Sequence, residues 1–110
     1  MAPLMVHISF LRNSAIALFP FILFKDEASK KDAVLLNHEK IHLRQQIELL
    51  IIPFYIIYLI NYILNLVKYR NHFKAYMNIA FEKEAYHHDQ NLQYLNYRRP
   101  FSFMKFFYTR

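Results

Sequence analysis

The sequence predicts a mainly α-helical fold with a short N-terminal β-ribbon, built as a single domain over residues 1–110. Three observations support this fold class. A chain of 110 residues is close to the smallest size that can bury a core unaided. The segments 32–52 and 72–95 contain no helix breaker. Glycine is absent, so turns with positive φ must be made by Asn or Asp or avoided, which favours long helices with loose connections.

The composition indicates a membrane-associated protein. Hydrophobic residues make up 55% of the chain and charged residues 20%, which means that the apolar residues are concentrated in segments. The net charge of +6 could attract nucleic acid or an anionic membrane surface. Because the basic residues are scattered and the aromatic residues lie in apolar runs, we expect membrane lipid as a partner and no nucleic acid.

The first element expected is extended. The segment "SAIALFPFILF", residues 14–24, is too short to cross a membrane as a helix, and its Phe and Ile content favours strands. Pro20 would confine it to a sheet edge or a bend. Ser29, followed three residues later by Asp32, resembles a capping box. A helix is therefore expected to start near residue 30 and to continue to Ile52.

The next segment, residues 47–67, is hydrophobic and about long enough to cross a hydrocarbon core. Pro53 must kink or end a helix there. A stripe of polar and aromatic residues suits a membrane interface better than the bilayer centre, and it consists of Tyr55, Tyr58, Tyr62, Asn65 and Tyr69. The pattern leaves open whether this segment spans the membrane or lies flat on it.

Two further elements complete the chain. Residues 72–95 predict a second long helix with no breaker inside it. The tail, residues 96–110, alternates cations with aromatic residues. This alternation is typical of a membrane-surface anchor, in which the cationic heads reach water while the rings enter the bilayer.

One motif carries chemistry: His38, Glu39 and His42 spell H-E-x-x-H within the first predicted helix. The i, i+4 spacing places both imidazoles on one helix face, close enough to hold one Zn²⁺ ion. The adjacent Glu39 can then polarise a water molecule at the open coordination position. Because the chain has no cysteine, the strong metal ligands must come from His, Asp and Glu.

A catalytic zinc site usually has three protein ligands, so a third residue is needed. The later segment "FEKEAYHHD" offers Glu82 or Glu84, which would give a His-His-Glu set. It also offers His87 or His88, which would give three histidines. These residue types alone leave the choice open.

The pairing of "NHEKIH" with "FEKEAY" resembles the gluzincin metallopeptidases, especially membrane-embedded ones of the CAAX-prenyl-protease and β-lactam-sensor types. In the former, the second motif reads roughly F-E-x-x-A-D, which places Phe81, Glu82 and Ala85 in register. The resemblance covers about residues 30–90. It implies that Glu82 is the third zinc ligand and that Glu39 is catalytic. It also implies that the protein lies in the inner membrane of a bacterium.

The chain departs from that family at one position. Where the family has an aspartate that orients a zinc histidine, this chain has Tyr86, which brings no negative charge. Asp89, one turn further on, is the nearby carboxylate that could substitute. Together with Glu84 and His88, these residues are the expected surroundings of the metal.

A distance argument refines the expected fold. A straight helix from Glu39 to Val67 would end about 42 Å from the metal at 1.5 Å per residue. The chain from Val67 to Glu82 would return only about 22 Å if helical. Both motifs can therefore meet at one ion only if the chain folds back, and Pro53 is the predicted place.

The expected function is hydrolysis of a protein or peptide substrate by a zinc metallopeptidase with Glu39 as general base. Tyr86, His88 or His72 could stabilise the oxyanion. The extended segment from Ala15 to Phe24 could align a substrate strand by edge pairing. The alternative is a small non-catalytic subunit, zinc-binding or metal-free, that uses a peptidase-like scaffold within a larger membrane complex.

Overall fold

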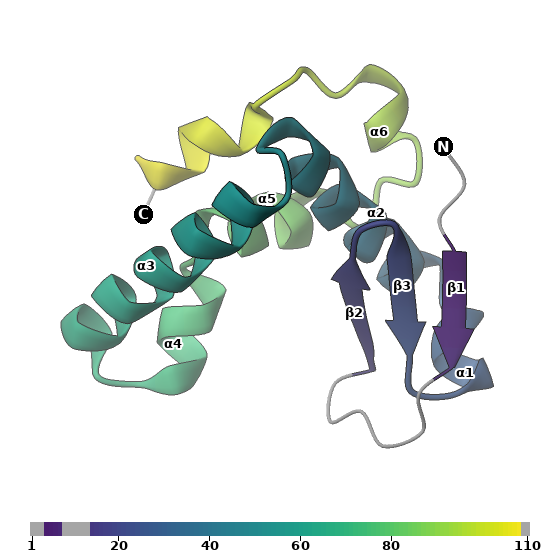
Figure 1. Cartoon of the computed structure of the whole chain (residues 1–110), viewed down its shortest axis with the longest axis horizontal. Coiled ribbons are helices and arrows are strands. Elements are labelled where there is room, and N and C mark those ends of the chain that lie inside the picture. Colours follow the sequence, from purple (N-terminus) through teal and green to yellow (C-terminus); the bar gives the residue numbers. More distant parts are fainter. Residues whose placement is uncertain (1–3, 8–13, 109–110) are drawn as a thin grey trace.

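The computed structural model describes residues 4–7 and 14–108, with only the backbone described for Leu4, Val6 and His7. The chain is mainly helical, with a small sheet at one end (Figure 1), so the predicted fold class is confirmed to that extent. In chain order the elements are β1 Leu4–His7, β2 Ala15–Leu18, β3 Phe21–Phe24, α1 Glu27–Lys30, α2 Ala33–Glu48, α3 Ile52–Tyr69, α4 His72–Met77, α5 Ala80–His88, α6 Tyr94–Tyr97 and the 3₁₀ helix η1 Ser102–Phe107.

The predicted β-ribbon is an antiparallel hairpin of β2 and β3, with Pro20 in its turn. β1 pairs in parallel with β3, which gives the strand order β1-β3-β2 and leaves β2 at an edge of the sheet. Ile22 and Phe24 of β3 are fully buried and belong to one apolar cluster with Leu43 of α2. The sheet therefore packs on α2, with β2 beside that helix.

A buried amide fixes the hairpin to α2. Gln46 donates from Nε2 to the carbonyl oxygen of Ala17 at 2.9 Å, and its Oε1 accepts the backbone N–H of Phe19 at 2.8 Å. Its side chain is only 1% exposed. Because a buried backbone group without a partner is costly, these two bonds hold the end of β2 in place against α2.

The predicted capping box of Ser29 and Asp32 is wrong. Asp26 caps α1 by accepting the N–H of Ser29, and Asp32 caps α2 by accepting the N–H of Leu35. Each aspartate thus begins its own helix, and the longer one begins at Ala33 and not near residue 30. It also ends at Glu48, four residues before the predicted end.

The predicted fold-back after the first motif is confirmed, but it occurs before Pro53. The N–H of Ile51 bonds to the carbonyl of Gln46 at 2.7 Å, which closes the end of α2. Leu50 and Ile51 adopt positive φ angles of 60° and 70°. Pro53 lies in the first turn of α3, where its missing N–H leaves no bond unmade.

The expectation that Asn or Asp would make the turns with positive φ is wrong. The described residues with positive φ are Leu50, Ile51, Arg70 and Phe101. These conformations cost more for residues with a Cβ than for glycine. Asparagines act instead as helix caps, as Asn71 does for α4, and as bridges between helices, as Asn61 does between α3 and α5.

The predicted unbroken helix over residues 72–95 is also wrong, because the segment divides into α4, α5 and α6. Asn71 caps α4, and Ile79 is extended. The first N–H of α5, at Ala80, donates to Oδ1 of Asn61 on α3 at 2.8 Å. This cap comes from a residue nineteen positions away, so no local pattern reveals it. The break lets α5 pack against α2.

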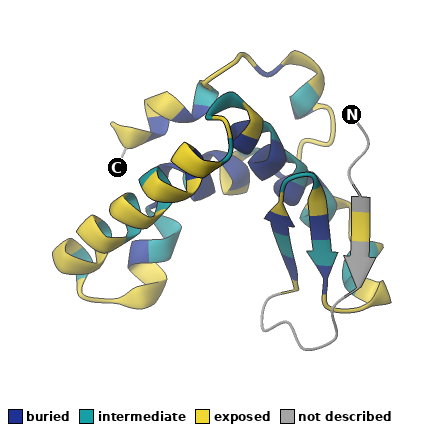
Figure 2. Cartoon of the chain, in the orientation of Figure 1, coloured by how far each residue is buried: buried dark blue, intermediate teal, exposed yellow. Residues whose placement is uncertain are grey.

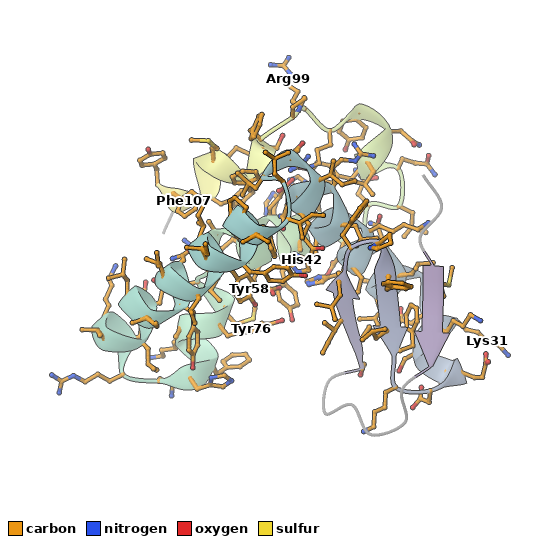
Figure 3. All side chains as sticks on the ribbon, viewed as in Figure 1. Lys31, His42, Tyr58, Tyr76, Arg99 and Phe107 are labelled. Carbon is orange, nitrogen blue, oxygen red and sulfur yellow. The ribbon has the colours of Figure 1, made fainter. Side chains whose placement is uncertain are left out.

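The tail packs on α5 (Figure 1) and does not extend as a free anchor. Phe103 and Phe106 are buried, and Phe103 joins an apolar cluster with Phe54 and Phe81. Arg98 is buried as well. The expectation that these rings enter a bilayer and that this cation reaches water is therefore wrong, although the neighbouring Arg99 points outward into solvent (Figure 3).

Among the helices in the described part of the chain, α3 is the one that is long and apolar enough to cross a membrane. Only 6% of its residues are buried inside the protein. Its outer side is exposed along almost the whole helix (Figure 2).

Replacing Gln46 with leucine is expected to destabilise the fold, because it leaves the N–H of Phe19 unmatched and leaves the carbonyl of Ala17 with only the longer 3.4 Å bond from Tyr55. An unmatched group costs about 1–3 kcal/mol. The free energy of unfolding, measured by urea denaturation, should fall by at least about 1 kcal/mol, while the exposed control Gln90→Leu should change it little. An unchanged midpoint for Gln46→Leu would show that this amide does not hold the sheet.

Candidate metal centre

The two histidines of the H-E-x-x-H motif face α5 from one side of α2. Both His38 and His42 are buried, and their ring centroids are 4.8 Å apart. The packing of α2 against α5 brings them next to the second motif. Figure 3 places His42 in the middle of the molecule, close to Tyr58 and Tyr76.

Glu82 is the acidic residue that meets both imidazoles. Its Oε1 lies 3.1 Å from Nε2 of His38 and 3.0 Å from Nε2 of His42. The ligand atoms of the three residues all lie within 4.8 Å of one another, and all three residues are buried. Within the described ranges, this is the one group of three or more His, Cys, Asp or Glu residues that could hold a metal ion.

The orientation of His42 is set by a buried amide. Gln45 donates from Nε2 to the carbonyl of Phe81 at 3.1 Å and to Oε1 of Glu84 at 2.9 Å. Both of those partners only accept, so the amide cannot be flipped, and its Oε1 faces Nδ1 of His42 at 2.8 Å. Nδ1 therefore carries a proton, and in the neutral ring the lone pair lies on Nε2, toward Glu82.

His38 is oriented in the same way by a carboxylate. Oδ2 of Asp89 accepts from Nδ1 of His38 at 3.1 Å. Asn37 fixes the loop that carries this aspartate by donating to the carbonyl of Asp89 at 2.8 Å. Asp89 therefore orients His38, the role that it was predicted to take because position 86 carries no aspartate. Its hydrogen bond with Nδ1 directs Nε2 of His38 toward Glu82.

This arrangement fits a metal ion. Two Nε2 lone pairs and a carboxylate oxygen point at one another, and they repel unless a cation or protons lie between them. Zinc with tetrahedral bonds of about 2.1 Å holds its ligand atoms about 3.4 Å apart, close to the contacts of Glu82 with the two rings. Since the ligand atoms of all three residues lie within 4.8 Å of one another, small shifts of the side chains would bring every pair to the separation that zinc requires.

Without a metal, protons take the place of the cation. Burial by itself would lower the pKa of His42, but the charge and hydrogen bond of Glu82, with the charge of Glu39, raise it to about 9. Burial would likewise raise the pKa of Glu82, but charged His42 and the hydrogen bonds from both histidines and Tyr58 lower it. The metal-free site is thus held by a buried ion pair.

Glu39 lies on the open side of the site. Its side chain is buried, yet it lines the same cleft as His38 and His42. Burial raises its pKa, against the opposing charges of the two histidines. A carboxylate with a raised pKa beside a metal site is a stronger proton acceptor than an ordinary glutamate.

Two tyrosines hold the carboxylate of Glu82. Tyr58 of α3 donates to its Oε2 at 2.7 Å, and Tyr76 of α4 donates to its Oε1 at 3.3 Å. Burial and the charge of Glu82 raise the pKa of both hydroxyls, so that both remain protonated donors. Tyr86 packs its ring against His38 with centroids 4.4 Å apart and shares a hydrogen bond with Tyr76 at 2.8 Å.

Glu84 and His88 lie outside the ligand group. Glu84 is fully buried, accepts from Gln45 and Tyr94, and forms an ion pair with Arg98. His88 stacks on Tyr94, with ring centroids 3.7 Å apart. In this structure Glu84 therefore orients the amide that orients His42 and does not face the ion site itself.

Arg98 connects this polar layer to the tail. Its guanidinium contacts Glu84 and also Glu48 at the end of α2, with Nη1 2.7 Å from the Glu48 carboxylate. A continuous path of hydrogen bonds thus runs from the tail through Glu84 and Gln45 to His42. The buried tail contributes to the geometry of the site.

The site opens into a cleft of about 240 Å³. One wall is the whole of β2, and the opposite wall includes Phe54, Tyr55 and Tyr58 of α3. A second hollow of about 500 Å³ also reaches His38 and Glu39, and its lining includes Tyr76 and Tyr86. The three predicted ligands and the predicted base therefore lie where a small substrate segment could reach them.

Sequence reasoning did not assign roles to several residues of this site. Gln45 lies on the same helix face as His42, three residues on, so its place was predictable although its role was not. Tyr58 belonged to a stripe interpreted as a membrane interface, but it points inward to Glu82. Tyr76 reaches the site only because the chain breaks after α4, for which the local sequence gives no signal.

Comparison of the chain with protein-family models, curated proteins and solved structures finds no match. The function is therefore inferred from the site and not from relatives.

The metal-free protein is expected to lose stability as the pH rises from about 6 to about 9. The pKa of His42 is raised from 6.5 to about 9 in the folded state, so its stabilising effect is complete below 6.5 and disappears as the pH approaches 9. The lowered pKa of Glu82 adds stability above 4.5, which is lost as the pH falls.

Urea midpoints measured with a chelator present test this pH dependence. They should decrease between about pH 6 and about pH 9, and His42→Gln should remove most of the decrease by eliminating the titrating ring. The same decrease in both proteins would exclude His42 as its source.

Proposed function

We propose that this chain is a zinc-dependent peptide hydrolase of the gluzincin kind, with His38, His42 and Glu82 as metal ligands and Glu39 as general base. The observation that carries this proposal is the convergence of both Nε2 atoms on one oxygen of Glu82. The carboxyl group of Glu39 beside them in an open cleft distinguishes this group from an ordinary buried ion pair.

Zinc fits the donor set better than other common ions. Two imidazole nitrogens and one carboxylate oxygen are the ligands of several catalytic zinc sites, whereas calcium and magnesium prefer oxygen ligands alone. Three protein ligands leave one coordination position for water. When bound, zinc would lower the pKa of that water and polarise a peptide carbonyl.

The residues of the chain supply the proton transfers and the positioning. Glu39 takes a proton from the attacking water and delivers it to the leaving amine. Tyr76 lies within 3.3 Å of Glu82 and lines the cleft, so its protonated hydroxyl can donate to the carbonyl oxygen as negative charge develops. Tyr58 stays on Oε2 of Glu82 and holds that carboxylate toward the histidines.

The edge strand β2 is the proposed support for the substrate backbone. It pairs with β3 along one edge, and all four of its residues line the cleft that holds Glu39 and His42. The carbonyl oxygen of Ala17 already accepts from Gln46 and Tyr55, so an extended peptide would form its main-chain hydrogen bonds at the start of β2, beside Ala15, while its scissile carbonyl lies near the metal site. Substrates would then be recognised mainly through an extended backbone.

A second candidate function is a non-catalytic subunit, zinc-binding or metal-free, of a larger membrane complex. It is favoured by the large exposed apolar surface of α3, which exceeds what a small soluble enzyme needs. Under this alternative Glu39 has no chemical role.

Replacing Glu39 with glutamine separates the two functions. In the peptidase, hydrolysis of an internally quenched peptide library by the purified zinc-loaded protein should fall by at least about 100-fold, because the general base is lost. The zinc affinity should change little, because Glu39 is not a ligand. The matched control Glu27→Gln, an exposed acid on α1, should leave hydrolysis unchanged.

Two outcomes would contradict the peptidase proposal. Glu39→Gln could retain full hydrolysis, which would exclude the assigned base. Alternatively, the parent protein could bind zinc and cleave none of the peptides, which would favour the non-catalytic subunit.

A further inference from the structure

The helix α3 turns polar residues toward the protein and apolar residues toward the outside, which is the reverse of a surface helix in a soluble protein. Its polar residues point inward and bond to the helices that complete the site: Tyr58 to Glu82, Asn61 to Ala80, Tyr62 to His72 and Asn65 to Ala75. A surface helix in water normally turns its apolar face inward and its polar face out. The outer face of α3 therefore does not match an aqueous environment.

That outer face is a continuous apolar stripe. Six residues at helical spacing make up what we call the α3 stripe: Ile52, Ile56, Leu59, Ile60, Ile63 and Val67. Each is between 48% and 71% exposed, and no charged residue interrupts them. Figure 2 shows this exposure along the outer side of the helix. A surface of this length and uniformity indicates a partner.

The charges around the stripe indicate what that partner is. No Asp or Glu occurs between Glu48 and Glu82, whereas Lys68, Arg70 and Lys74 are all exposed around the turn from α3 to α4. An apolar face bordered only by cations complements an anionic lipid surface, where each such cation contributes about 1 kcal/mol of attraction.

The start of α3 extends the same surface. Leu50 is 80% exposed and has a positive φ of 60°. Asparagine adopts this conformation with less strain and caps helices elsewhere in this chain. A leucine that is both strained and exposed stabilises nothing in water, but it adds apolar area where a bilayer could cover it.

We propose that α3 lies flat on an anionic bilayer, with its stripe among the acyl chains, and does not cross it. An 18-residue helix is about 27 Å long, which is close to the bilayer thickness. However, α3 is bonded along its inner face to α4 and to the start of α5. Asn61, in the middle of α3, is bonded to the start of α5, so a crossing α3 would carry α5 and its charged residues to the depth of the hydrocarbon, where a charge costs at least about 2.5 kcal/mol.

The docked orientation has a consequence for the cleft. Tyr55 and Tyr58 of α3 line it, so it would open close to the level of the lipid headgroups. Peptide segments at the membrane surface are then the substrate class. This last step rests on the proposed function, whereas the docking itself does not.

A tryptophan scan of the full chain tests the depth of α3, because the sequence contains no tryptophan. The variants Ile52→Trp, Ile60→Trp and Val67→Trp place one fluorophore at each end and in the middle of the stripe. With vesicles of phosphatidylcholine and phosphatidylglycerol, all three emissions should shift to the blue. Lipids brominated near the headgroup should quench all three to the same extent. If Ile60→Trp were quenched mainly by lipids brominated deep in the acyl chains, while Ile52→Trp and Val67→Trp were quenched mainly by lipids brominated near the headgroup, α3 would span the bilayer and the proposal would be overturned.

Vesicle sedimentation tests the stripe and the cations. The double variant Ile60→Asp with Ile63→Asp should weaken binding by at least about tenfold, since it removes buried apolar area. The control Leu92→Asp, in the turn before α6, changes a similarly exposed apolar residue and should bind like the parent. Lys68→Gln with Lys74→Gln should reduce both the affinity and its sensitivity to salt.

Three results would overturn the docking. The parent could fail to bind these vesicles, or the stripe variants could bind as tightly as the parent. Alternatively, the stripe variants could abolish self-association measured without lipid, which would identify a second copy of the chain as the partner. None of these readouts depends on zinc or on hydrolysis, so they leave the proposed function to its own test.

Discussion

The site depends on the fixed tautomers of two histidines. The Oε1 atom of Gln45 and the Oδ2 atom of Asp89 accept the Nδ1 protons of His42 and His38, so both Nε2 atoms are directed at Glu82. In water such rings would rotate and exchange tautomers freely. Here burial and these acceptors fix them. The result is a cluster of three donors that is stable only with a cation or with added protons, and this instability is what makes the cluster a candidate metal centre.

Most of the fold can be understood as support for that cluster. The strained turn at Leu50 and Ile51 reverses the chain, and the side chain of Asn61 begins α5 at the position from which Glu82 reaches α2. Because Asn61 belongs to α3, the helix with the exposed apolar stripe is also the helix that positions Glu82. A change in how α3 is supported, by lipid or by water, would therefore act on the site through a short path of hydrogen bonds.

The motif residues of the site could be identified from the sequence, but most of the residues that surround them could not. His38 and His42 are brought together by helical spacing alone, so their proximity was predictable from a local rule. Glu82 was predicted as the third ligand through a resemblance. In the structure it lies beside both histidines because Asn61 caps the start of α5, a long-range contact that no local sequence pattern encodes. The inward direction of Tyr58 and the burial of Arg98 were not predicted, because both depend on which polar groups the folded chain leaves without partners. The apolar character of α3 was evident from its composition, whereas the direction in which the α3 stripe faces required the structure.

The coordination of zinc in the purified protein tests the central claim most directly. X-ray absorption at the zinc edge should show one ion per chain with two imidazole nitrogens and carboxylate or water oxygens, at about 2.0–2.2 Å. His42→Ala should lose the ion, while Glu27→Gln, a change of an exposed acid on α1, should retain it with the same ligand set. A protein without stoichiometric zinc, or a spectrum left unchanged by His42→Ala, would contradict the account.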